Sequence, residues 1–559
     1  METPRVGESS SAPWPDREFG ASGNQFALAT PHHLATEAGR MAFEEGGNAL
    51  DAALAAAAML AVVYPHQSSP GGDVFVVLSV PGGGVTAING SGAAPLAVDP
   101  DELRADGAAM PVRGPLTVTV PGAVAAWEAV ADLGARLGLA RAVDPAVAAA
   151  GQGVPVAPGL ARAVAALAPT LAGDPGMAEV FLPEGRPIPE GATVCQPALA
   201  RTLGAVAEHG TESFYRGEIA ERLAAGLSAV GSPMTPADLA AHQSQVVRPL
   251  GGRYQDREIL TAPPNSQGFA LLQILSVLER IDGSPDPLGS SAPALEVLFR
   301  AVSDDRDRWL CDPRRTRVPL DVLLGDEHLD ELAGRARDAL ARISGAGGLP
   351  SGGIGEGQGP RGGPEAPAPS GDTVAVVAMD AEGYAVSLIQ SLWESFGSGI
   401  LEPSTGLILH NRGTLFSLDP DHPASLEGGV RPPHTLTPVL VRGPDGRVEA
   451  SVGTMGGRAQ PQILVQVLVR LLDHGADPEA AVAAPRWIAP YYGTAEDRLI
   501  LAEPEAAAGL ELSRSFSSDR LIVVDTDAEE TGHAQVVRAD KRELTAGSDP
   551  RADGSAAAG

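Results

Sequence analysis

The chain has 559 residues, of which 44% are hydrophobic and 20% are charged, a composition that is ordinary for a globular protein with a large apolar core. Acidic residues outnumber basic residues by 70 to 40, so the formal net charge is −30 at pH 7. Because such a charge repels nucleic-acid phosphates and anionic lipid headgroups, we expect no nucleic-acid partner and no membrane partner.

Targeting and cysteine signals predict a cytoplasmic protein. Residues 1–25 contain no apolar run of signal-peptide length, and we expect them to form a disordered leader. The apolar run 52–64 has about 13 residues, which is too short to cross a bilayer. Cys195 and Cys311 are the only cysteines, so no disulfide framework is expected.

The first part of the chain reads as helices around one buried strand. A helical stretch is predicted from Phe26 and continues through 36–43. An alanine-rich helix follows over 48–65, and 73–80 is predicted to be a buried strand bounded by glycines. Residues 120–345 are mostly helical by the period of their apolar residues.

The segment 344–371 is nearly all Gly, Pro, Ser and Ala. It cannot bury much apolar surface, so we expect a flexible linker. Directly after it, the alternating and β-branched segments 373–380 and 384–391 predict a β-hairpin. The remaining part is predicted to hold a helix over 462–474, a polar tail from about 540, and strands over 405–410, 437–442, 447–453 and 520–525. This alternation of strands and helices predicts an α/β or α+β sandwich.

The histidines do not suggest a metal site. His32, His33, His66 and His410 lack the spacing of metal ligands and have no acidic cluster beside them. We therefore expect neither a metal ion nor another cofactor.

The junction between the linker and the hairpin suggests a site of self-cleavage. If the chain cut itself between Asp372 and Thr373, the linker would leave and a new N-terminal threonine would stand on a rigid strand. Its free α-amine, with an ordinary pKa of about 7.7 to 8.0, would serve as general base for its own hydroxyl. The alternative is an interdomain linker followed by an ordinary strand.

Ten blocks of sequence, in register from about residue 26 to 535, resemble the γ-glutamyltranspeptidase family of N-terminal-nucleophile hydrolases. The blocks are 29–39, 46–51, 65–66, 71–72, 196–203, 214–215, 304–308, 371–373, 396–400 and 432–438, and the pair Gly456-Gly457 completes the pattern. The resemblance implies a four-layer αββα sandwich built from two autoproteolytic fragments. These are a large fragment over 26–372 that ends in the linker, and a small fragment over 373–559. The fragments would form a heterodimer that is open to further dimerisation.

Carried over to this sequence, the resemblance makes Asp372–Thr373 the cleavage site and Thr373 the catalytic nucleophile. Ser391 takes the place of a family threonine that hydrogen-bonds the nucleophile. Gly456 and Gly457 would offer backbone N–H groups to the oxyanion of a tetrahedral intermediate. The alternatives are a plain strand hydroxyl at Ser391 and a tight turn without catalytic function at the two glycines.

The sequence also departs from the family at the groups that bind a glutamyl substrate. The motif at 91–95 contains no arginine for the α-carboxylate. Trp393 replaces an asparagine, Leu415 replaces the acidic residue that binds the α-amine, and His434-Thr435 replaces two adjacent serines. The site has therefore lost the groups that bind an amino acid's ammonium and carboxylate.

Two arginines stand inside the motifs that build the site, and they suggest an anionic acyl group instead. Arg412 lies near the lost acid and Arg458 follows the oxyanion glycines. The alternative is that either arginine faces solvent or pairs with a structural carboxylate. His434 could hydrogen-bond the substrate or be structural. The predicted substrate-binding residues are Trp393, Arg412, His434, Thr435 and Arg458.

These observations predict a self-processing threonine hydrolase that cleaves an acyl bond, either an amide or a C–C bond, in a small anionic substrate. The resemblance implies a family with γ-glutamyl transferases, cephalosporin-type acylases and an oxamate amidohydrolase. It also includes members in antibiotic biosynthesis that release oxalate. The alternatives are a conventional γ-glutamyl hydrolase or transpeptidase acting on glutathione-like donors, and a processed but inactive binding protein.

Overall fold

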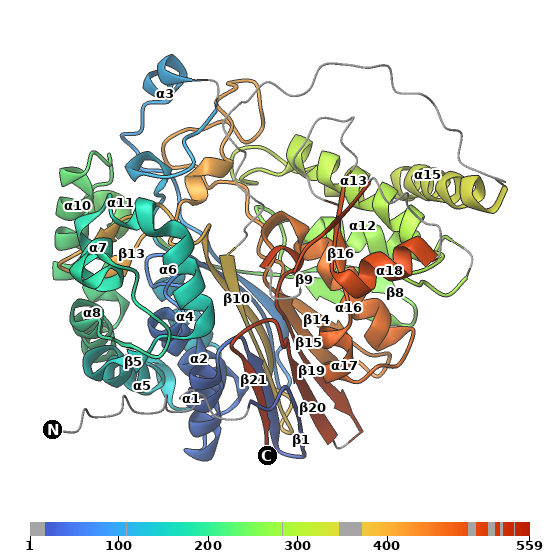
Figure 1. Ribbon diagram of the computed structural model, residues 1–559, viewed down its shortest axis with the longest axis horizontal. Coiled ribbons are helices and arrows are strands. Elements are labelled where there is room, and N and C mark those ends of the chain that lie inside the picture. Colours follow the sequence, from blue (N-terminus) through green and yellow to red (C-terminus); the bar gives the residue numbers. More distant parts are fainter. Residues whose placement is uncertain are drawn as a thin grey trace, which may run out of the picture.

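The structure is a computed structural model that describes residues 17–107, 109–281, 283–345, 372–489, 499–512, 520–525, 529–541 and 543–559. Within these ranges two seven-stranded sheets pack face to face, and helices cover the outer face of each sheet. Figure 1 shows the strands in the middle of the molecule with helices on the left and on the right. The predicted α+β sandwich, with layers in the order αββα, is confirmed.

The first sheet, called here the β10 sheet, holds the predicted hairpin at its centre. Its described strands are antiparallel, in the order β21 (Ser555–Ala558), β2 (Phe26–Thr30), β10 (Asp372–Asp380), β11 (Ala385–Trp393), β3 (Asp73–Val80), β4 (Gly84–Gly90) and β7 (Gln245–Val247). Strand β10 is buried along nearly its whole length. Its continuous apolar run is therefore that of a strand covered on both faces.

The second sheet, called here the β15 sheet, is also antiparallel. Its described strands follow the order β1 (Gly20–Gly23), β20 (Glu543–Ser548), β19 (Ala534–Asp540), β15 (Val448–Thr454), β14 (Val439–Arg442), β9 (Arg257–Thr261) and β8 (Leu250–Tyr254). Both sheets contain strands from before and from after Thr373. The two predicted fragments therefore do not form separate domains but share one core.

Alternation along β10 separates the two faces of its sheet. Val374 and Val376 pack into the core under the helices, whereas Ala375 and Val377 pack into the small clusters between the two sheets. Because successive side chains of a strand point to opposite faces, Thr373 shares the face of Ala375, towards the β15 sheet.

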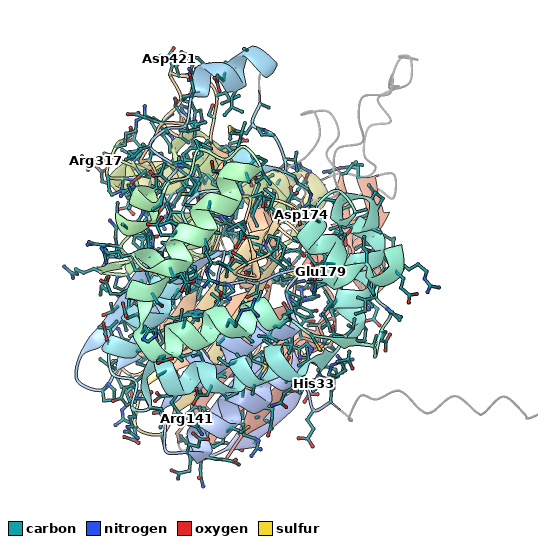
Figure 2. All side chains as sticks on the ribbon, turned by 90° about the vertical axis from the view of Figure 1, so that its left-hand side faces the viewer. His33, Arg141, Asp174, Glu179, Arg317 and Asp421 are labelled. Atoms are coloured by element: carbon teal, nitrogen blue, oxygen red, sulfur yellow. The ribbon has the colours of Figure 1, made fainter. Side chains whose placement is uncertain are left out.

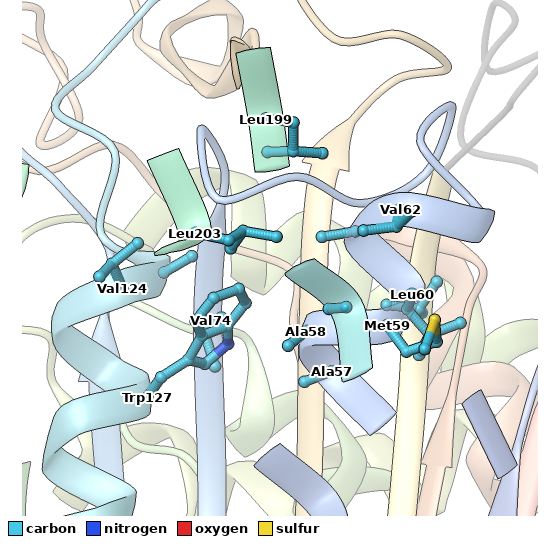
Figure 3. Close-up of a cluster of buried hydrophobic side chains, with 14 of the residues drawn as sticks. Ala57, Ala58, Met59, Leu60, Val62, Val74, Val124, Trp127, Leu199 and Leu203 are labelled. Carbon is cyan, nitrogen blue, oxygen red and sulfur yellow. The ribbon is translucent and has the colours of Figure 1, made fainter. Parts of the chain in front are cut away.

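Helices of the N-terminal part cover the outer face of the β10 sheet. Helices α1 (His33–Glu44), α2 (Ala49–Val63) and α4 (Ala123–Asp132) pack on its strands, while α5 (Gly138–Gln152) packs on α2 and α8 (Pro197–His209) packs on α5. Every residue of α2 is buried, and Asn48 and Asp51 close its N-terminus as a capping box. Figure 3 shows α2 residues such as Leu60 and Val62 in one cluster with Val74 and Trp127. The many alanines let α2 lie close to the sheet.

A second group of helices covers the β15 sheet. It consists of α12 (Gly268–Leu278), α13 (Ala292–Trp309), α15 (Asp326–Gly345), α16 (Gln460–Leu472) and α17 (Pro478–Ala483). The other described elements are shorter or more peripheral: α3 (Pro100–Asp106), α6 (Pro158–Leu171), α7 (Pro175–Phe181), α9 (Thr211–Tyr215), α10 (Glu218–Ala229), α11 (Pro236–Ala240), α14 (Leu320–Leu323), α18 (Pro504–Leu512), β5 (Val154–Pro155), β6 (Thr193–Val194), β12 (Leu401–Glu402), β13 (Leu407–Ile408), β16 (Trp487–Ile488), β17 (Ile500–Ala502) and β18 (Leu521–Val523). Charged side chains such as Arg141, Arg317 and Asp421 lie at the periphery (Figure 2).

Both ends of the chain differ from the prediction. The leader was predicted over residues 1–25. Residues 1–16 lie outside the described residues, and the last part of the prediction is wrong because Gly20–Gly23 forms β1 on β20. The helix expected from Phe26 begins only at His33, since Phe26–Thr30 forms β2 between β10 and β21. The polar tail expected from about 540 is wrong as well, because β20 and β21 complete the two sheets.

Two further boundaries change. Most of the expected linker, 346–371, lies outside the described residues, while residues 344 and 345 belong to α15. The mostly helical region 120–345 contains β7, β8 and β9, which extend the edges of the two sheets. No helix within the described ranges is long and apolar enough to cross a membrane.

Candidate active site

Thr373 lies at the start of β10, in the middle of the β10 sheet, and is only 1% exposed to solvent. Asp372 precedes it within the same strand, so the structure shows the uncut chain. Ser391 on β11 is its partner across the ladder. The hairpin therefore brings the predicted nucleophile, the predicted cleavage site and the predicted supporting hydroxyl to one place.

The hydroxyl of Ser391 joins four groups at this place. Thr373 Oγ1 donates to Ser391 Oγ at 3.1 Å, and Ser391 Oγ donates to the carbonyl oxygen of Asp372 at 2.8 Å. The backbone N–H of Trp393 donates to the same hydroxyl at 2.8 Å, and Arg412 Nη2 donates to it at 3.0 Å. Ser391 thus contacts both the predicted nucleophile and the bond that would be cut.

Arg412 is fully buried, at the start of the short helix η3 (Arg412–Leu415). Its Nη1 donates to Thr435 Oγ1 at 3.2 Å, and its guanidinium lies 4.7 Å from the ring centroid of Trp393. It forms no ion pair with a carboxylate of the described residues, and its Nε has no hydrogen-bond partner among them. Burial lowers the pKa of Arg412 to about 9. The site therefore holds a buried cation without a directly bonded anion.

A buried carboxylate that sequence reasoning missed lies behind this cation. Asp73 Oδ2 is 3.0 Å from His434 Nε2 and 3.6 Å from His410 Nδ1, and Gly92 N–H donates to Asp73 Oδ1 at 3.3 Å. Burial alone would raise the pKa of Asp73, but His410, His434 and Arg412 outweigh it and lower this pKa to about 2. Asp73 is therefore an anion that balances Arg412 without touching it.

Both histidines of this cluster are neutral at neutral pH. Burial and then Arg412 lower the pKa of His434 to about 3, and burial also lowers the pKa of His410. His410 Nε2 lies 3.0 Å from the carbonyl oxygen of Thr119. The contact with Asp73 gives His434 a buried partner, and its ring also lines the cavity described below, so its role in substrate binding stays a prediction.

Gly456 and Gly457 follow β15 and open the short helix η4 (Gly457–Ala459), which runs directly into α16. Their φ angles of +133° and +51° lie in the left-handed region, and the first N–H groups of a helix have no acceptor within it. Gln267 ties this turn to the site, since its Nε2 donates to Thr435 O at 2.9 Å and to Gly457 O at 3.0 Å. Gln267 thus links the turn to Thr435, and the oxyanion role of the turn stays a prediction.

A cavity of about 200 Å³ adjoins the site. Its walls include His434, Thr435, Arg458 and Leu415, while Arg458 also lies 3.9 Å from Asp307, another wall residue. Thr373, Ser391, Trp393 and Arg412 are not among the lining residues. In the uncut chain, the cavity therefore ends at Thr435, one hydrogen bond from Arg412.

The carboxyl group of Asp372 is also buried. Burial, followed by the neighbouring carboxyl of Glu529, raises the pKa of Asp372 well above its usual range. Glu529 is itself held by Gln67, whose Nε2 donates to Glu529 Oε1 at 3.3 Å. The residue before the predicted nucleophile is therefore packed inside the protein and not on the surface.

Comparison with known proteins decides the family. The family model described as gamma-glutamyltranspeptidase matches residues 35–559. The chain belongs to the γ-glutamyltranspeptidase family. The resemblance inferred from the sequence is thereby confirmed, and with it the assignment to a family of hydrolases and acyltransferases.

The proteins that are similar to this chain are named for different activities. The chain is 38% identical to the oxamate amidohydrolase proenzyme of Klebsiella pneumoniae, over 94% of this chain and 97% of that protein. It is 35% identical to a glutathione hydrolase-like proenzyme of Bacillus subtilis, over 96% and 98% of the two chains. The structure matches a cephalosporin acylase from Bacillus halodurans with a TM-score of 0.84 and 30% identity, over 99% of each chain. The family therefore fixes the fold and the type of enzyme but leaves the substrate open.

Proposed function

We propose that the chain cuts itself between Asp372 and Thr373 and then uses Thr373 to hydrolyse an acyl bond in a small anionic substrate. The observation that carries this proposal is the hydroxyl of Ser391, which is bonded at once to Thr373 Oγ1, to the Asp372 carbonyl and to the buried cation of Arg412. The oxamate amidohydrolase of Klebsiella pneumoniae and the glutathione hydrolase-like protein of Bacillus subtilis are both named as proenzymes, which supports self-processing.

The fold supports a stable pair of fragments after the cut. In the β10 sheet, β10 lies between β2 of the large fragment and β11 of the small fragment, and β11 pairs with β3 of the large fragment. Cleavage at one peptide bond leaves these ladders intact. We therefore expect a tightly held heterodimer.

In the cut enzyme, the α-amine of Thr373 would take the proton of its own hydroxyl, and Thr373 Oγ would attack the substrate carbonyl. Backbone N–H groups of Gly456 and Gly457 would bind the resulting oxyanion. Arg412 would bind a carboxylate of the substrate, because a buried guanidinium without a bonded anion favours a charge-assisted hydrogen bond. Thr435 and Arg458 extend this site into the cavity.

The geometry favours a short acyl group. The hydrogen bonds of 3.0 and 3.1 Å through Ser391 place Arg412 Nη2 no more than about 6 Å from Thr373 Oγ1. A carbonyl carbon must come within about 3 to 3.5 Å of the nucleophile, so the carboxylate has to be bonded close to that carbon. An oxalyl amide meets this requirement, whereas a glutaryl amide would have to fold back. The oxamate amidohydrolase relative supports the same substrate class.

The experiment that tests this proposal combines two measurements on the purified protein. Mass spectrometry should find two chains, with the smaller one beginning at Thr373. The cut protein should release ammonia or an amine from oxamate-type amides. An intact wild-type chain would overturn the self-processing part, and cut protein that acts only on γ-glutamyl donors would overturn the substrate class.

The pH profile should identify the general base. Because the base must be neutral to accept a proton, kcat/KM should rise with pH up to the α-amine's pKa, about 7.7 to 8.0 in its ordinary range. His434, with a pKa of about 3, does not titrate near neutral pH. An acidic limb with a midpoint near pH 4 would point to a carboxylate base and contradict this assignment.

Replacing Gly456 by Ala should separate strain from catalysis. A Cβ at this position would lie 2.4 Å from Ile463 Cδ1, on a backbone with φ +133°, and would shift the N–H groups of the turn. We expect kcat to fall by about 100-fold, since losing one oxyanion donor costs this much or more. Gly475→Ala is the matched control, because Gly475 also has a positive φ but no atom within 4 Å of an added Cβ. Both variants share the strain of a side chain at positive φ, and Gly456→Ala should lose more thermal stability because of its contact with Ile463. Equal activity in the two variants would contradict the oxyanion role.

A further inference from the structure

A single hydroxyl, that of Ser391, links Arg412 to the peptide bond between Asp372 and Thr373 that would be cut. Its Nη2 donates to Ser391 Oγ at 3.0 Å, and that hydroxyl donates its own proton to the carbonyl oxygen of Asp372 at 2.8 Å. The guanidinium is fully buried and makes no ion pair within the described part of the chain. Its charge is therefore little screened along this path.

The same contacts change the properties of the Ser391 hydroxyl. A hydroxyl oxygen has two lone pairs and one proton to donate, so the three donors that point at Ser391 Oγ, from Arg412, Trp393 and Thr373, share its two lone pairs. Because a cation pulls electron density from the oxygen, the O–H bond becomes a stronger donor to the Asp372 carbonyl. The carbonyl carbon then becomes more open to attack by Thr373 Oγ.

We propose that Arg412 is a positioning residue for self-cleavage, which acts through Ser391 to polarise the Asp372 carbonyl. This inference rests on the proposed cut before Thr373. It adds a second role for Arg412, which under the proposed function binds the substrate carboxylate only after the cut. Arg412 would then act both in self-cleavage and in the binding of the substrate carboxylate.

The step balances without any further reactant except water. Thr373 Oγ forms a bond to the Asp372 carbonyl carbon, while the π electron pair moves to the carbonyl oxygen. The Thr373 hydroxyl proton passes to Ser391 Oγ as Ser391 gives its own proton to that oxygen. The C–N bond then breaks, its electron pair stays on nitrogen, and the proton moves from the oxygen to this nitrogen. The products are an ester and the free α-amine of Thr373, and water hydrolyses the ester to the Asp372 carboxylate and the Thr373 hydroxyl.

A second arginine offers a matched control for the loss of a buried cation. Arg431 is 4% exposed, and its guanidinium donates to the side chain of Gln245 and to the carbonyl of Gln243, not to Ser391. Arg431→Ala removes a buried guanidinium of the same size as Arg412→Ala does. The two variants therefore share any general loss of packing or stability and differ in their contact with the cleavage site.

The test follows the cleavage of newly made full-length chain over time, by gel electrophoresis after cell-free synthesis. We expect Arg412→Ala and Arg412→Gln to slow cleavage at least 30-fold, Arg412→Lys to be intermediate, and Arg431→Ala to stay within threefold of the wild type. Added guanidinium ion at non-denaturing concentration should restore cleavage of Arg412→Ala but should not change Arg412→Gln, in which a side chain fills the space. Thermal unfolding of each uncut chain verifies that it is folded.

The outcomes separate this inference from the proposed function. A wild-type chain that stays uncut overturns both. A wild type that is cut before Thr373, together with Arg412→Ala cut at the same rate, overturns this inference alone. Equal slowing by Arg412→Ala and Arg431→Ala, or a slow Arg412→Ala that guanidinium does not restore, shows a merely structural role and also overturns it.

Discussion

The Thr373→Ala chain should remain a single uncut polypeptide of 57.0 kDa without hydrolase activity. Wild-type protein should instead run as two fragments, the smaller with 187 of the 559 residues and about 19 of the 57.0 kDa. Alanine removes the only atom that can attack the Asp372 carbonyl from this position and leaves the ladder to Ser391 in place. Gel electrophoresis and intact-mass measurement check both expectations.

Thr373→Ser is the matched control, since it keeps a hydroxyl at the same position. It should be cut, more slowly than the wild type because serine lacks the methyl group that restricts χ1. A small fragment that begins at any residue other than Thr373 would contradict the assignment of the nucleophile. So would a Thr373→Ala chain that is still cut at this bond.

The central hairpin could be predicted from sequence because its signals are local. Strands β10 and β11 are rich in β-branched residues and are joined by a turn, and the observed register places Thr373 opposite Ser391. Two of the missed strands, which lie at the outer ends of the two sheets, have no such signal. Strand β21 has the sequence Ser-Ala-Ala-Ala and β1 has Gly-Ala-Ser-Gly, which have low strand propensity. They are strands because β2 and β20 offer them an edge, and this depends on the tertiary fold.

Some residues of the candidate site could be predicted from the sequence, whereas at least one could not. The family pattern marks Thr373 and Ser391, and Arg412 was singled out because it lies near the lost acidic residue of its motif. The structure joins all three by hydrogen bonds. Asp73 was missed, because its partner His434 is 361 residues away in sequence. One signal could have pointed to it, since an acidic residue at the start of a fully buried strand requires a partner.

A γ-glutamyl anilide should be a poor substrate, with kcat/KM at least about 100-fold below that of a matched oxalyl anilide. Its ammonium and α-carboxylate would enter a site in which Leu415 offers no carboxylate and Trp393 no amide. The motif at 91–95 has no guanidinium, and Ser91 is itself bonded to Asn89 and Asn265. Uncompensated desolvation of two charges costs several kcal/mol. The oxalyl group has one carboxylate next to the reacting carbonyl, within reach of Arg412.

A series of anilides and one variant test this predicted substrate preference. Oxalyl, succinyl and glutaryl anilides carry the same leaving group and one carboxylate at increasing distance from the carbonyl. If the short distance between Arg412 and Thr373 determines the preferred acyl group, kcat/KM should fall along this series. If Arg458 contacts the carboxylate of these anions, Arg458→Ala should lower kcat/KM by an amount equivalent to about 1.5 to 3 kcal/mol. The rates are calculated per molecule of cut chain. An unchanged rate would leave Arg458 with Asp307, its 3.9 Å neighbour. Rapid turnover of the γ-glutamyl anilide would instead show that other groups bind the amino acid, and it would restore the conventional γ-glutamyl hydrolase.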